Sequence, residues 1–442
     1  MTATEQMQTA LYGDPPSPSH KPDRAGVLVA FEGLETAVEG KVDKSSLPVN
    51  VKDAPYNAKG DGSTDDTAAF VAAFAYAVAY ACDIFVPAGK YIVQPLTLNS
   101  TSYAYMPTIY GSGRNSTTLK KKAGSGIGPV LTIGASDATN SMSGIVLRDM
   151  TIDGLSTTES SSAIAGYNLV RSHFTGLKLK NADKVLRFYG GVSVRVSDSE
   201  ISAGNFGVYA DSFSGSAGLN WPNGITLEGK TIIQGHTTRG VYFNNGRMLQ
   251  ILDCEIDTCG TAGNNTTSAV YVGPNVDSED AGVNPIGAII ERCWFEQCAG
   301  AASIVFSSGD NTLINSNFGP NPNSVYDVYV SGGTYAMDNC RWTTPIKTPA
   351  IYETGANIAG SYVSRCRQLG VNNISVVGAK TQYDFAGRVY TVSTLPSPPS
   401  GKMRAWVSDS AAAAPANFGA LLMGGGANSV PVFFDGTNWR IG

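Results

Sequence analysis

The feature that most limits how this chain can fold is a short apolar repeat in its central part. Each copy contains an apolar residue, four further residues and a second apolar residue, with small or polar residues after it. The second apolar residues lie 22 to 39 residues apart, with a mean spacing of about 27. The copies are Leu147–Ile152, Phe174–Leu179, Val196–Ile201, Leu227–Ile232, Ile251–Ile256, Ile290–Phe295, Leu313–Phe318, Met337–Trp342 and a degraded Ser364–Leu369. Such a period is typical of solenoids, propellers and repeat arrays.

The side chains within each copy decide between these architectures. They alternate with the period of two that a strand requires: Cys254 and Ile256 share one face, and Asp253, Glu255 and Asp257 share the other. No helical period separates the copies. The sequence therefore predicts an all-β chain built on a right-handed parallel β-helix over residues 94–385, in which each copy is one strand of a rung. Seven side chains are expected inside it: Ile152, Ile201, Ile232, Ile256, Phe295, Phe318 and Trp342.

Composition and charge exclude several classes of partner. Only 15% of the 442 residues are charged, and a net charge of −5 offers no basic surface for nucleic acid. The longest charge-free apolar stretch, residues 68–82, is too short to span a membrane and is interpreted as a buried helix. The first residues lack the basic and apolar regions of a secretory signal peptide. We therefore expect no nucleic-acid or membrane partner, and synthesis in a cytoplasm.

The cysteines and histidines predict neither a metal site nor a cofactor. Seven cysteines are an odd number, so a complete disulfide framework is not expected. Cys254, Cys293 and Cys340 each lie two residues before a repeat position, so they should stack as reduced, buried side chains. A disulfide between neighbouring rungs is the alternative. The three histidines lie far apart in the sequence, and no CxxC or HExxH motif occurs.

A second recognisable segment precedes the repeat. Residues 51–93 contain the turn Asp61-Gly62, a predicted helix at about 66–81, and Pro87-Ala88-Gly89 leading into a strand at 90–93. This segment closely resembles the N-terminal signature of the pectate-lyase-like β-helix superfamily, as found in bacteriophage tailspikes and related polysaccharide-degrading enzymes. The resemblance implies that residues 51–93 cap the β-helix and that their Asp residues are structural.

The two ends of the chain extend this resemblance. Residues 401–442 resemble a short C-terminal module found at the ends of many phage tail proteins, and we expect a small β unit there behind a Pro-rich linker at 386–400. In residues 1–50, Val27, Phe31, Leu34 and Val38 follow heptad spacing. We interpret this part as a virion-attachment peptide and trimerising neck, the alternative being a single amphipathic helix. The expected assembly is a homotrimer that binds other tail or baseplate proteins of a virion through residues 1–50.

Candidate chemistry lies on the outward face of the repeat. The polygalacturonase motifs of the superfamily are absent, so no catalytic residue is carried over from it. Neighbouring outward side chains on a β-helix are roughly 5–7 Å apart, which suits the carboxylate pairs of glycosidases. The candidate catalytic residues are Glu255, Asp257 and Glu296. The candidate substrate-binding residues are Trp221, Arg292, Trp294 and Arg341. Catalysis, sugar binding without catalysis, and a solvated or intersubunit face remain alternatives.

Two long steps in the repeat predict walls beside this face. Residues 211–224 and 260–286 should emerge as loops that flank the candidate site, or else as ordinary mobile loops. Together these features predict a phage tailspike-like virion protein that recognises a bacterial surface polysaccharide and depolymerises it as a hydrolase or a lyase. The alternatives are a non-enzymatic glycan-binding adhesin and a structural decoration protein of the virion.

Overall fold

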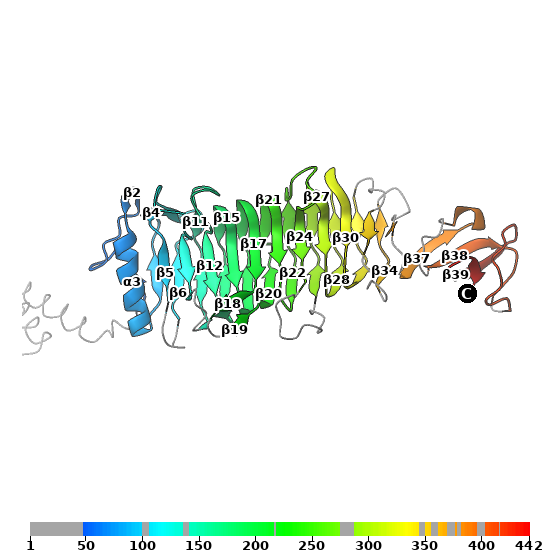
Figure 1. The fold of residues 1–442 in the computed structure, drawn as a ribbon, viewed down its shortest axis with the longest axis horizontal. Helices are drawn as coiled ribbons and strands as arrows, with labels where there is room; N and C mark the ends of the chain where they lie inside the picture. The colour runs from blue at the N-terminus through cyan, green and yellow to red at the C-terminus, as the bar shows by residue number, and fades with distance from the viewer. Residues whose placement is uncertain are drawn as a thin grey trace, which may run out of the picture.

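A computed structural model describes most of the chain beyond residue 46. The described residues are 47–99, 106–135, 141–215, 218–274, 287–343, 350–354, 361–368, 376–377, 382–395, 403–414 and 416–442. The predicted neck therefore lies outside the described residues. Figure 1 shows a long solenoid of strands with a helix at its N-terminal end and a small β module at its C-terminal end. The predicted parallel β-helix is confirmed.

Two large sheets run along the solenoid. Sheet A contains β1 (Val49–Asn50), β3 (Ile84–Val86), β6 (Thr108–Gly111), β9 (Met142–Ser143), β10 (Val146–Arg148), β13 (Leu169–Val170), β14 (His173–Thr175), β16 (Val192–Ser197), β20 (Asn223–Glu228), β22 (Leu249–Leu252), β25 (Ala288–Glu291), β28 (Asp310–Ile314), β31 (Thr334–Asp338), β34 (Tyr362–Ser364), β37 (Gln382–Tyr390), β38 (Met403–Ser410), β39 (Asn428–Phe434) and β40 (Trp439–Ile441).

Sheet B supplies two segments to most rungs. Its strands are β2 (Asp61–Asp65), β4 (Gly89–Val93), β5 (Leu96–Leu98), β7 (Thr117–Lys121), β8 (Leu131–Ile133), β11 (Thr151–Asp153), β12 (Ile164–Tyr167), β15 (Lys178–Tyr189), β17 (Glu200–Asp211), β21 (Ile232–Phe243), β23 (Glu255–Asp257), β24 (Ser268–Val272), β26 (Trp294–Glu296), β27 (Ala299–Phe306), β29 (Asn317–Phe318), β30 (Asn323–Val330), β32 (Arg341–Trp342), β33 (Ile351–Glu353), β35 (Arg367–Gln368) and β36 (Val376–Val377). A separate hairpin joins β18 (Phe213–Gly215) to β19 (Gly218–Asn220).

Each copy of the repeat forms two short strands and not the single strand predicted. A strand of sheet A is followed by one residue in the left-handed region and then by the first segment of sheet B, as in β22, Asp253 and β23. The left-handed residue has φ between 49° and 60° in seven rungs. It is Asp149, Asp198, Asp253, Arg292, Asn315, Asn339 or Arg365. Asp and Asn tolerate this conformation better than most residues, which explains their frequency at the corner.

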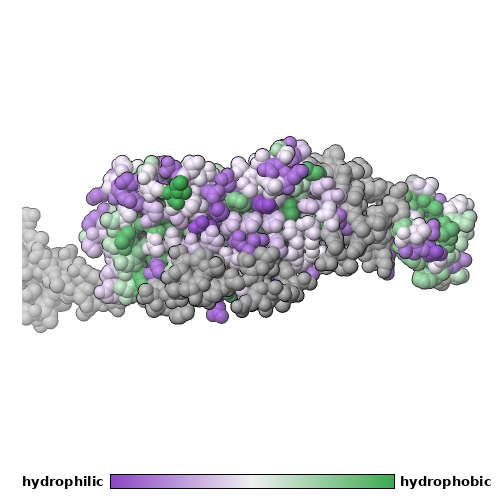
Figure 2. Space-filling model, viewed as in Figure 1, coloured by the Kyte–Doolittle hydropathy of each residue, from purple (hydrophilic) through white to green (hydrophobic). Residues whose placement is uncertain are grey.

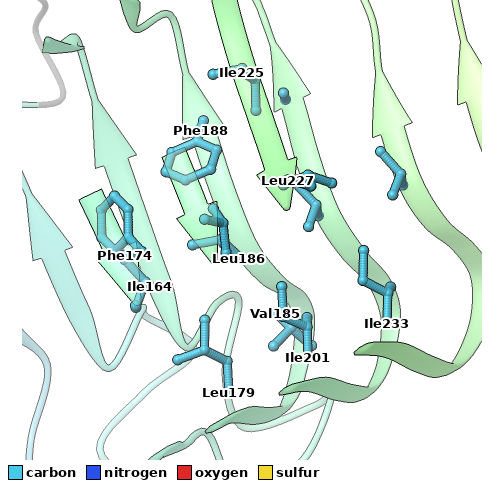
Figure 3. Close-up of a cluster of buried hydrophobic side chains, with 14 of the residues drawn as sticks. Ile164, Phe174, Leu179, Val185, Leu186, Phe188, Ile201, Ile225, Leu227 and Ile233 are labelled. Atoms are coloured by element: carbon cyan, nitrogen blue, oxygen red, sulfur yellow. The ribbon is translucent and has the colours of Figure 1, made fainter. Parts of the chain in front are cut away.

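The interior follows the repeat with one correction. Six of the seven side chains predicted to be inside are buried, but Ile232 is only half-buried. Its neighbour Ile233 takes the interior position and pairs in register with Ile201 and Ile256. The corner before it contains two left-handed residues, Gly229 and Lys230, so this copy is one residue longer than the pattern assumed. Figure 3 shows Ile201 and Ile233 in the same apolar cluster.

The N-terminal cap agrees closely with the sequence interpretation. Helix α3 (Thr67–Tyr80) ends at the left-handed Ala81 and buries Phe70 and Phe74. The carboxylate of the buried Asp66 accepts hydrogen bonds from the backbone N–H groups of Lys59 and Gly60, at 2.6 and 3.0 Å. This supports the structural role that the resemblance implied for the Asp residues. No helix in the described ranges is long and apolar enough to cross a membrane.

The cysteines are free thiols, and all but Cys366 are buried. Cys254 and Cys293 lie at equivalent positions of neighbouring rungs, just before β23 and β26, as the sequence predicted. Burial raises the pKa of the Cys259 thiol to about 12. The reduced, apolar interpretation of the cysteines therefore fits their surroundings.

The C-terminal module continues sheet A beyond the solenoid. Strand β37 runs to Tyr390, so it extends into the predicted linker, and a short 3-10 helix η2 (Val392–Thr394) follows. β38 pairs in parallel with β37, and β39 and β40 then add antiparallel strands. The module has its own small core of Tyr390, Ala405, Val407, Leu422, Val430, Val432 and Ile441.

Candidate functional site

Most of the predicted site residues meet on the outer face of the first sheet-B segment. Glu255 on β23 is in register with Trp294 on β26, and Asp257 is in register with Glu296. Arg341 on β32 lies two rungs beyond Trp294 in the same column. Residues that are about 40 positions apart in the sequence therefore lie side by side, because parallel strands stack about 4.8 Å apart.

Local contacts fix this patch. The indole Nε1–H of Trp294 donates to Glu296 Oε2 at 2.9 Å, and the hydroxyl of Thr258 donates to Asp257 Oδ1 at 2.8 Å. Arg292, at the corner, donates two hydrogen bonds to the carboxylate of Asp253, at 2.7 and 2.8 Å. This guanidinium lowers the pKa of Asp253. Arg292 is thus already paired within the protein, which weakens its predicted role in substrate binding.

A groove of about 640 Å³ follows the corner beside this patch. It collects residues from neighbouring rungs. Its lining residues are Gly229, Lys230, Ile232, Asp253, Cys254, Glu255, Arg292, Cys293, Trp294 and Asn317. Three of the predicted site residues, Glu255, Arg292 and Trp294, therefore line this groove. Asp257, Glu296 and Arg341 do not line it.

Trp221 lies at a different corner. It precedes β20 by two residues, where the chain returns to sheet A, and the guanidinium of Arg247 lies 5.1 Å from its ring centre. The predicted wall 211–224 contains the β18–β19 hairpin and belongs to this same corner. Of the second predicted wall, residues 260–274 are described, and residues 261–267 follow the end of β23. One predicted wall thus adjoins the patch, and the other does not.

The structure also reveals a surface that the sequence interpretation missed. The second sheet-B segment of a rung is formed by the last residues of β17 and β21 and by β24, β27, β30 and β33. Tyr209, Tyr242 and Tyr271 occupy one outward column on this segment. Tyr329 and Tyr352 continue the column after Val305. Tyr326 lies beside the column, with its ring centre 4.6 Å from that of Tyr352. We call these six tyrosines the aromatic strip. It follows the solenoid axis across six successive strands, β17, β21, β24, β27, β30 and β33, with Val305 in the column on β27.

The rings of the strip are held in place by one another and by arginine. Tyr209 and Tyr242 stack with ring centres 4.7 Å apart, and Tyr242 and Tyr271 stack at 5.4 Å. The guanidinium of Arg239 lies 4.0 Å from the ring centre of Tyr271. It also donates to Ser268 Oγ at 3.2 Å and to the carbonyl oxygen of Thr266 at 2.6 Å. The strip is therefore a fixed surface with an embedded cation.

Polar groups border the strip. The hydroxyl of Tyr209 donates to Asp211 Oδ2 at 3.0 Å, and Asn245 donates to Asp211 Oδ1 at 2.9 Å. Burial, with the nearby Asp211 carboxylate, raises the pKa of Tyr242 to about 12. The Tyr242 hydroxyl thus remains protonated at neutral pH and can donate or accept a hydrogen bond. Half-buried aromatic carbon flanked by such groups suits a ligand that is amphipathic along its length.

A signal for the strip was present in the sequence. Val208-Tyr209, Val241-Tyr242, Val270-Tyr271, Val328-Tyr329 and Ile351-Tyr352 repeat one apolar–tyrosine pair. Their spacing follows that of the repeat, but the pairs lie outside the copies that defined it. In each pair the apolar residue is buried and the tyrosine is half-buried on the outer side. A search of the sequence for a second repeated pair with the same spacing would have found the strip.

No set of three or more His, Cys, Asp or Glu residues in the described part of the chain could hold a metal ion. On the first sheet-B segment, the carboxylates of Asp257 and Glu296 lie in register on neighbouring rungs.

Comparison with known proteins agrees with this architecture. A family described as rhamnogalacturonase A/epimerase, pectate lyase-like, matches residues 48–265. Among solved structures, ORF18 of Geobacillus virus E2 is 17% identical with a TM-score of 0.55, covering 97% of this chain and 80% of the viral one. The A-module of the Azotobacter vinelandii mannuronan C-5 epimerase AlgE6 is 15% identical with a TM-score of 0.56, covering 76% and 98%. No curated protein matches the chain.

A bacterial surface protein shares the fold as well. PfbA, a surface adhesin of Streptococcus pneumoniae, is 11% identical with a TM-score of 0.53, covering 89% of this chain and 99% of the adhesin. The fold and these likenesses define the class of the protein, a right-handed parallel β-helix. The family model that matches residues 48–265 is of the pectate-lyase-like type, in agreement with the resemblance noted in the sequence.

Proposed function

We propose that this protein is a tailspike-like virion protein that binds a bacterial surface polysaccharide along the aromatic strip. The observation that carries the proposal is the outward column of tyrosines, interrupted at Val305, with Arg239 embedded in it. A similar fold in a protein of Geobacillus virus E2 supports the viral setting, and one in an epimerase named for mannuronan supports a polysaccharide ligand.

The shape of the strip favours a polymer over a compact ligand. It runs along the solenoid for six strands, and each strand adds about 4.8 Å. Sugar rings present apolar C–H faces and polar edges, which match aromatic carbon bordered by hydroxyl, amide and carboxylate groups. Arg239 adds a positive charge that an acidic sugar would complement. A small apolar ligand would use neither the length nor the polar border.

Replacing Tyr271 by Ala is expected to weaken polysaccharide binding by about tenfold or more, because Tyr271 lies in the middle of the strip and contacts Arg239. Binding to purified host capsule or lipopolysaccharide would be measured by surface plasmon resonance. Tyr362→Ala is the matched control, since Tyr362 is an exposed tyrosine on β34 of sheet A. Equal binding by the two variants would contradict the role of the strip.

Depolymerisation is a second candidate function, and one observation favours it. Asp257 and Glu296 lie in register on neighbouring rungs, beside the groove lined by Glu255 and Trp294. The spacing of adjacent rungs is close to the 5–5.5 Å that separates the two carboxyl groups of retaining glycosidases. In this proposal one carboxyl group is the acid and the other the nucleophile. A lyase would instead use an arginine such as Arg341 as base.

If the protein is a hydrolase, Glu296→Gln and Asp257→Asn should each lower turnover by about 100-fold or more while binding persists. Reducing ends and unsaturated uronates would be assayed together, because only a lyase generates the second product. Glu200→Gln is the control, as Glu200 lies on the same outer face two rungs earlier. A wild-type protein that binds the polysaccharide but releases neither product would leave the adhesin function and exclude the depolymerase.

The proposed protein acts as a homotrimer on the virion. Residues 1–50 would attach it to other tail or baseplate proteins, and the solenoid would present the strip to the host surface. The remaining alternative is a structural decoration protein, which predicts no polysaccharide binding by the wild-type chain.

A further inference from the structure

The aromatic strip is charged at one end only. Arg187 on β15 is in register with Tyr209 on β17, so it occupies the column of the strip one strand before the first tyrosine. Two strands after β15, on β21, the guanidinium of Arg239 lies against the ring of Tyr271. Lys184 adds a third cation, with its ammonium group 5.0 Å from the ring centre of Tyr209. We call Lys184, Arg187 and Arg239 the cationic end of the strip.

Two of these three cations lack a counter-ion. Lys184 pairs with Asp183 at 3.1 Å, but neither Arg187 nor Arg239 forms an ion pair in the part of the chain that the structure describes. Nη2 of Arg187 donates to the hydroxyl of Tyr167 at 3.2 Å, and its Nε is buried without a hydrogen-bond partner. Burial lowers the pKa of Arg239. Charges that are partly removed from water are normally paired, so both guanidinium groups indicate an anion that the chain itself does not supply.

A neighbouring carboxylate, that of Asp211, already has other partners. Asp211 is in register with Tyr189, whose ring centre lies 4.8 Å from the guanidinium of Arg187. Its two oxygens accept hydrogen bonds from the Tyr209 hydroxyl at 3.0 Å and the Asn245 amide at 2.9 Å. Asp211 therefore orders the polar border of the strip and leaves the two arginines without an ion pair.

The other end of the strip offers no cation. Strands β27, β30 and β33 contain no Lys, Arg or His, and their acidic residues Asp327 and Glu353 are buried. Ala302 and Val305 pack there against Tyr329. The visible face of the solenoid in Figure 2 likewise carries strongly hydrophilic residues in separate patches and not in a continuous band. An anion bound against this end would lose water and gain no opposite charge.

We propose that the ligand of the strip is a heteropolysaccharide with sparse negative charge. An acidic residue binds at the cationic end, and neutral sugars follow along Tyr326, Tyr329 and Tyr352. The inference rests on the proposed polysaccharide binding and names the class of polymer. The anion is a carboxylate or a phosphate group, because a guanidinium group binds either of them through two parallel hydrogen bonds.

The spacing of the cations favours sparse over dense charge. The strands of Arg187 and Arg239 are two rungs apart, about 10 Å along the solenoid axis. From β24 to β33 the strip continues for three more rungs, about 14 Å, without a cation. A polymer charged on every sugar would place anions against this uncharged end. A neutral polymer would leave both arginines unpaired, whereas widely spaced charge suits both ends.

Binding of the full-length chain to an array of purified bacterial capsular and O-antigen polysaccharides tests the class of polymer. The array contains neutral polymers, polymers with one acidic group among several neutral sugars, and polymers charged on every sugar. The second group should be retained most strongly. Reduction of its carboxyl groups, or removal of its phosphate groups, should weaken binding about tenfold or more and shows which anion is bound. Strongest binding to the neutral or to the densely charged polymers would overturn the proposal.

Arg187→Met tests the residue itself, because methionine keeps part of the side chain and removes the charge. Its affinity for the native polymer should fall about tenfold, while its affinity for the neutralised polymer stays that of the wild type. The ratio of the two affinities does not depend on how much of the variant is folded. Arg195→Met is the matched control, since Arg195 pairs with Glu228 on sheet A and its loss removes the same charge.

The two proposals fail in different ways. A wild-type protein that binds no polysaccharide of the array would refute the proposed function and this inference together. If the wild type binds, but neutralising the polymer or replacing Arg187 leaves the ratio of affinities unchanged, the proposed function stands and sparse negative charge is excluded.

Discussion

Replacing Phe318 by Ala is expected to lower the free energy of unfolding by about 3–5 kcal/mol. Phe318 is fully buried, and its ring stacks between Phe295 at 5.2 Å and Trp342 at 4.9 Å. Removing the middle ring leaves a cavity between two flat rings that are held by their own strands. Because each rung is covered only by its neighbours, the loss is not shared with a larger core.

Urea denaturation followed by circular dichroism would measure this effect, with soluble yield as a second readout. Tyr362→Ala is again the control, since an exposed aromatic residue of the same region should change stability by no more than about 0.5 kcal/mol. A Phe318→Ala protein as stable as this control would show that the stacked rings do not carry the solenoid interior.

Acidification from pH 6.5 to pH 4 is expected to destabilise the protein by about 3 kcal/mol through His236 alone. His236 is buried on β21, and its Nε2–H donates to the carbonyl oxygen of Ile201 at 3.0 Å. Burial lowers the pKa of its imidazole to about 4, against 6.5 for an exposed histidine. Below pH 6.5 the unfolded chain therefore takes up a proton that the folded chain rejects, and stability falls until the pH reaches about 4.

His236→Gln should flatten this part of the pH–stability profile, because a glutamine amide can donate to Ile201 and does not titrate. Stability of both proteins would be measured by denaturant titration at pH 7, 5.5 and 4. His173→Gln is the comparison: partial burial, aided by Arg195, also lowers the pKa of His173, but its ring is only half-buried, so its contribution should be smaller. Parallel profiles for wild type and His236→Gln would refute the assignment.

The sequence predicted the solenoid because its signal is repeated and local. An apolar pair at a mean spacing of about 27 residues predicts a stacked architecture regardless of the length of the loops. The same repeat predicted that Phe295, Phe318 and Trp342 lie in one interior column, where their rings stack. The helix and turn signals of residues 51–93 placed the cap. The same periodicity correctly brought Glu255 beside Trp294 and Asp257 beside Glu296.

Errors arose where one residue changes the direction of the chain. A single left-handed residue such as Asp253 divides each copy between two sheets. Side chains before and after this corner therefore do not share one face, even where the sequence alternates regularly across it. The extra left-handed residue at Gly229–Lys230 moved the interior position from Ile232 to Ile233. Trp221 was assigned to the patch because it lies in a long insertion, but the insertion opens at the other end of its sheet-A strand.

The sequence by itself determined the stacking of rungs, because repeated apolar pairs leave no other way to be covered. Only the tertiary structure decided which outward residues share a surface. The aromatic strip depends on corners that set Tyr209, Tyr242 and Tyr271 in register over gaps of 33 and 29 residues. The C-terminal module likewise depends on antiparallel pairing that sets Trp406 opposite Pro431. Both follow from strand register, which turn geometry and packing fix and local composition does not.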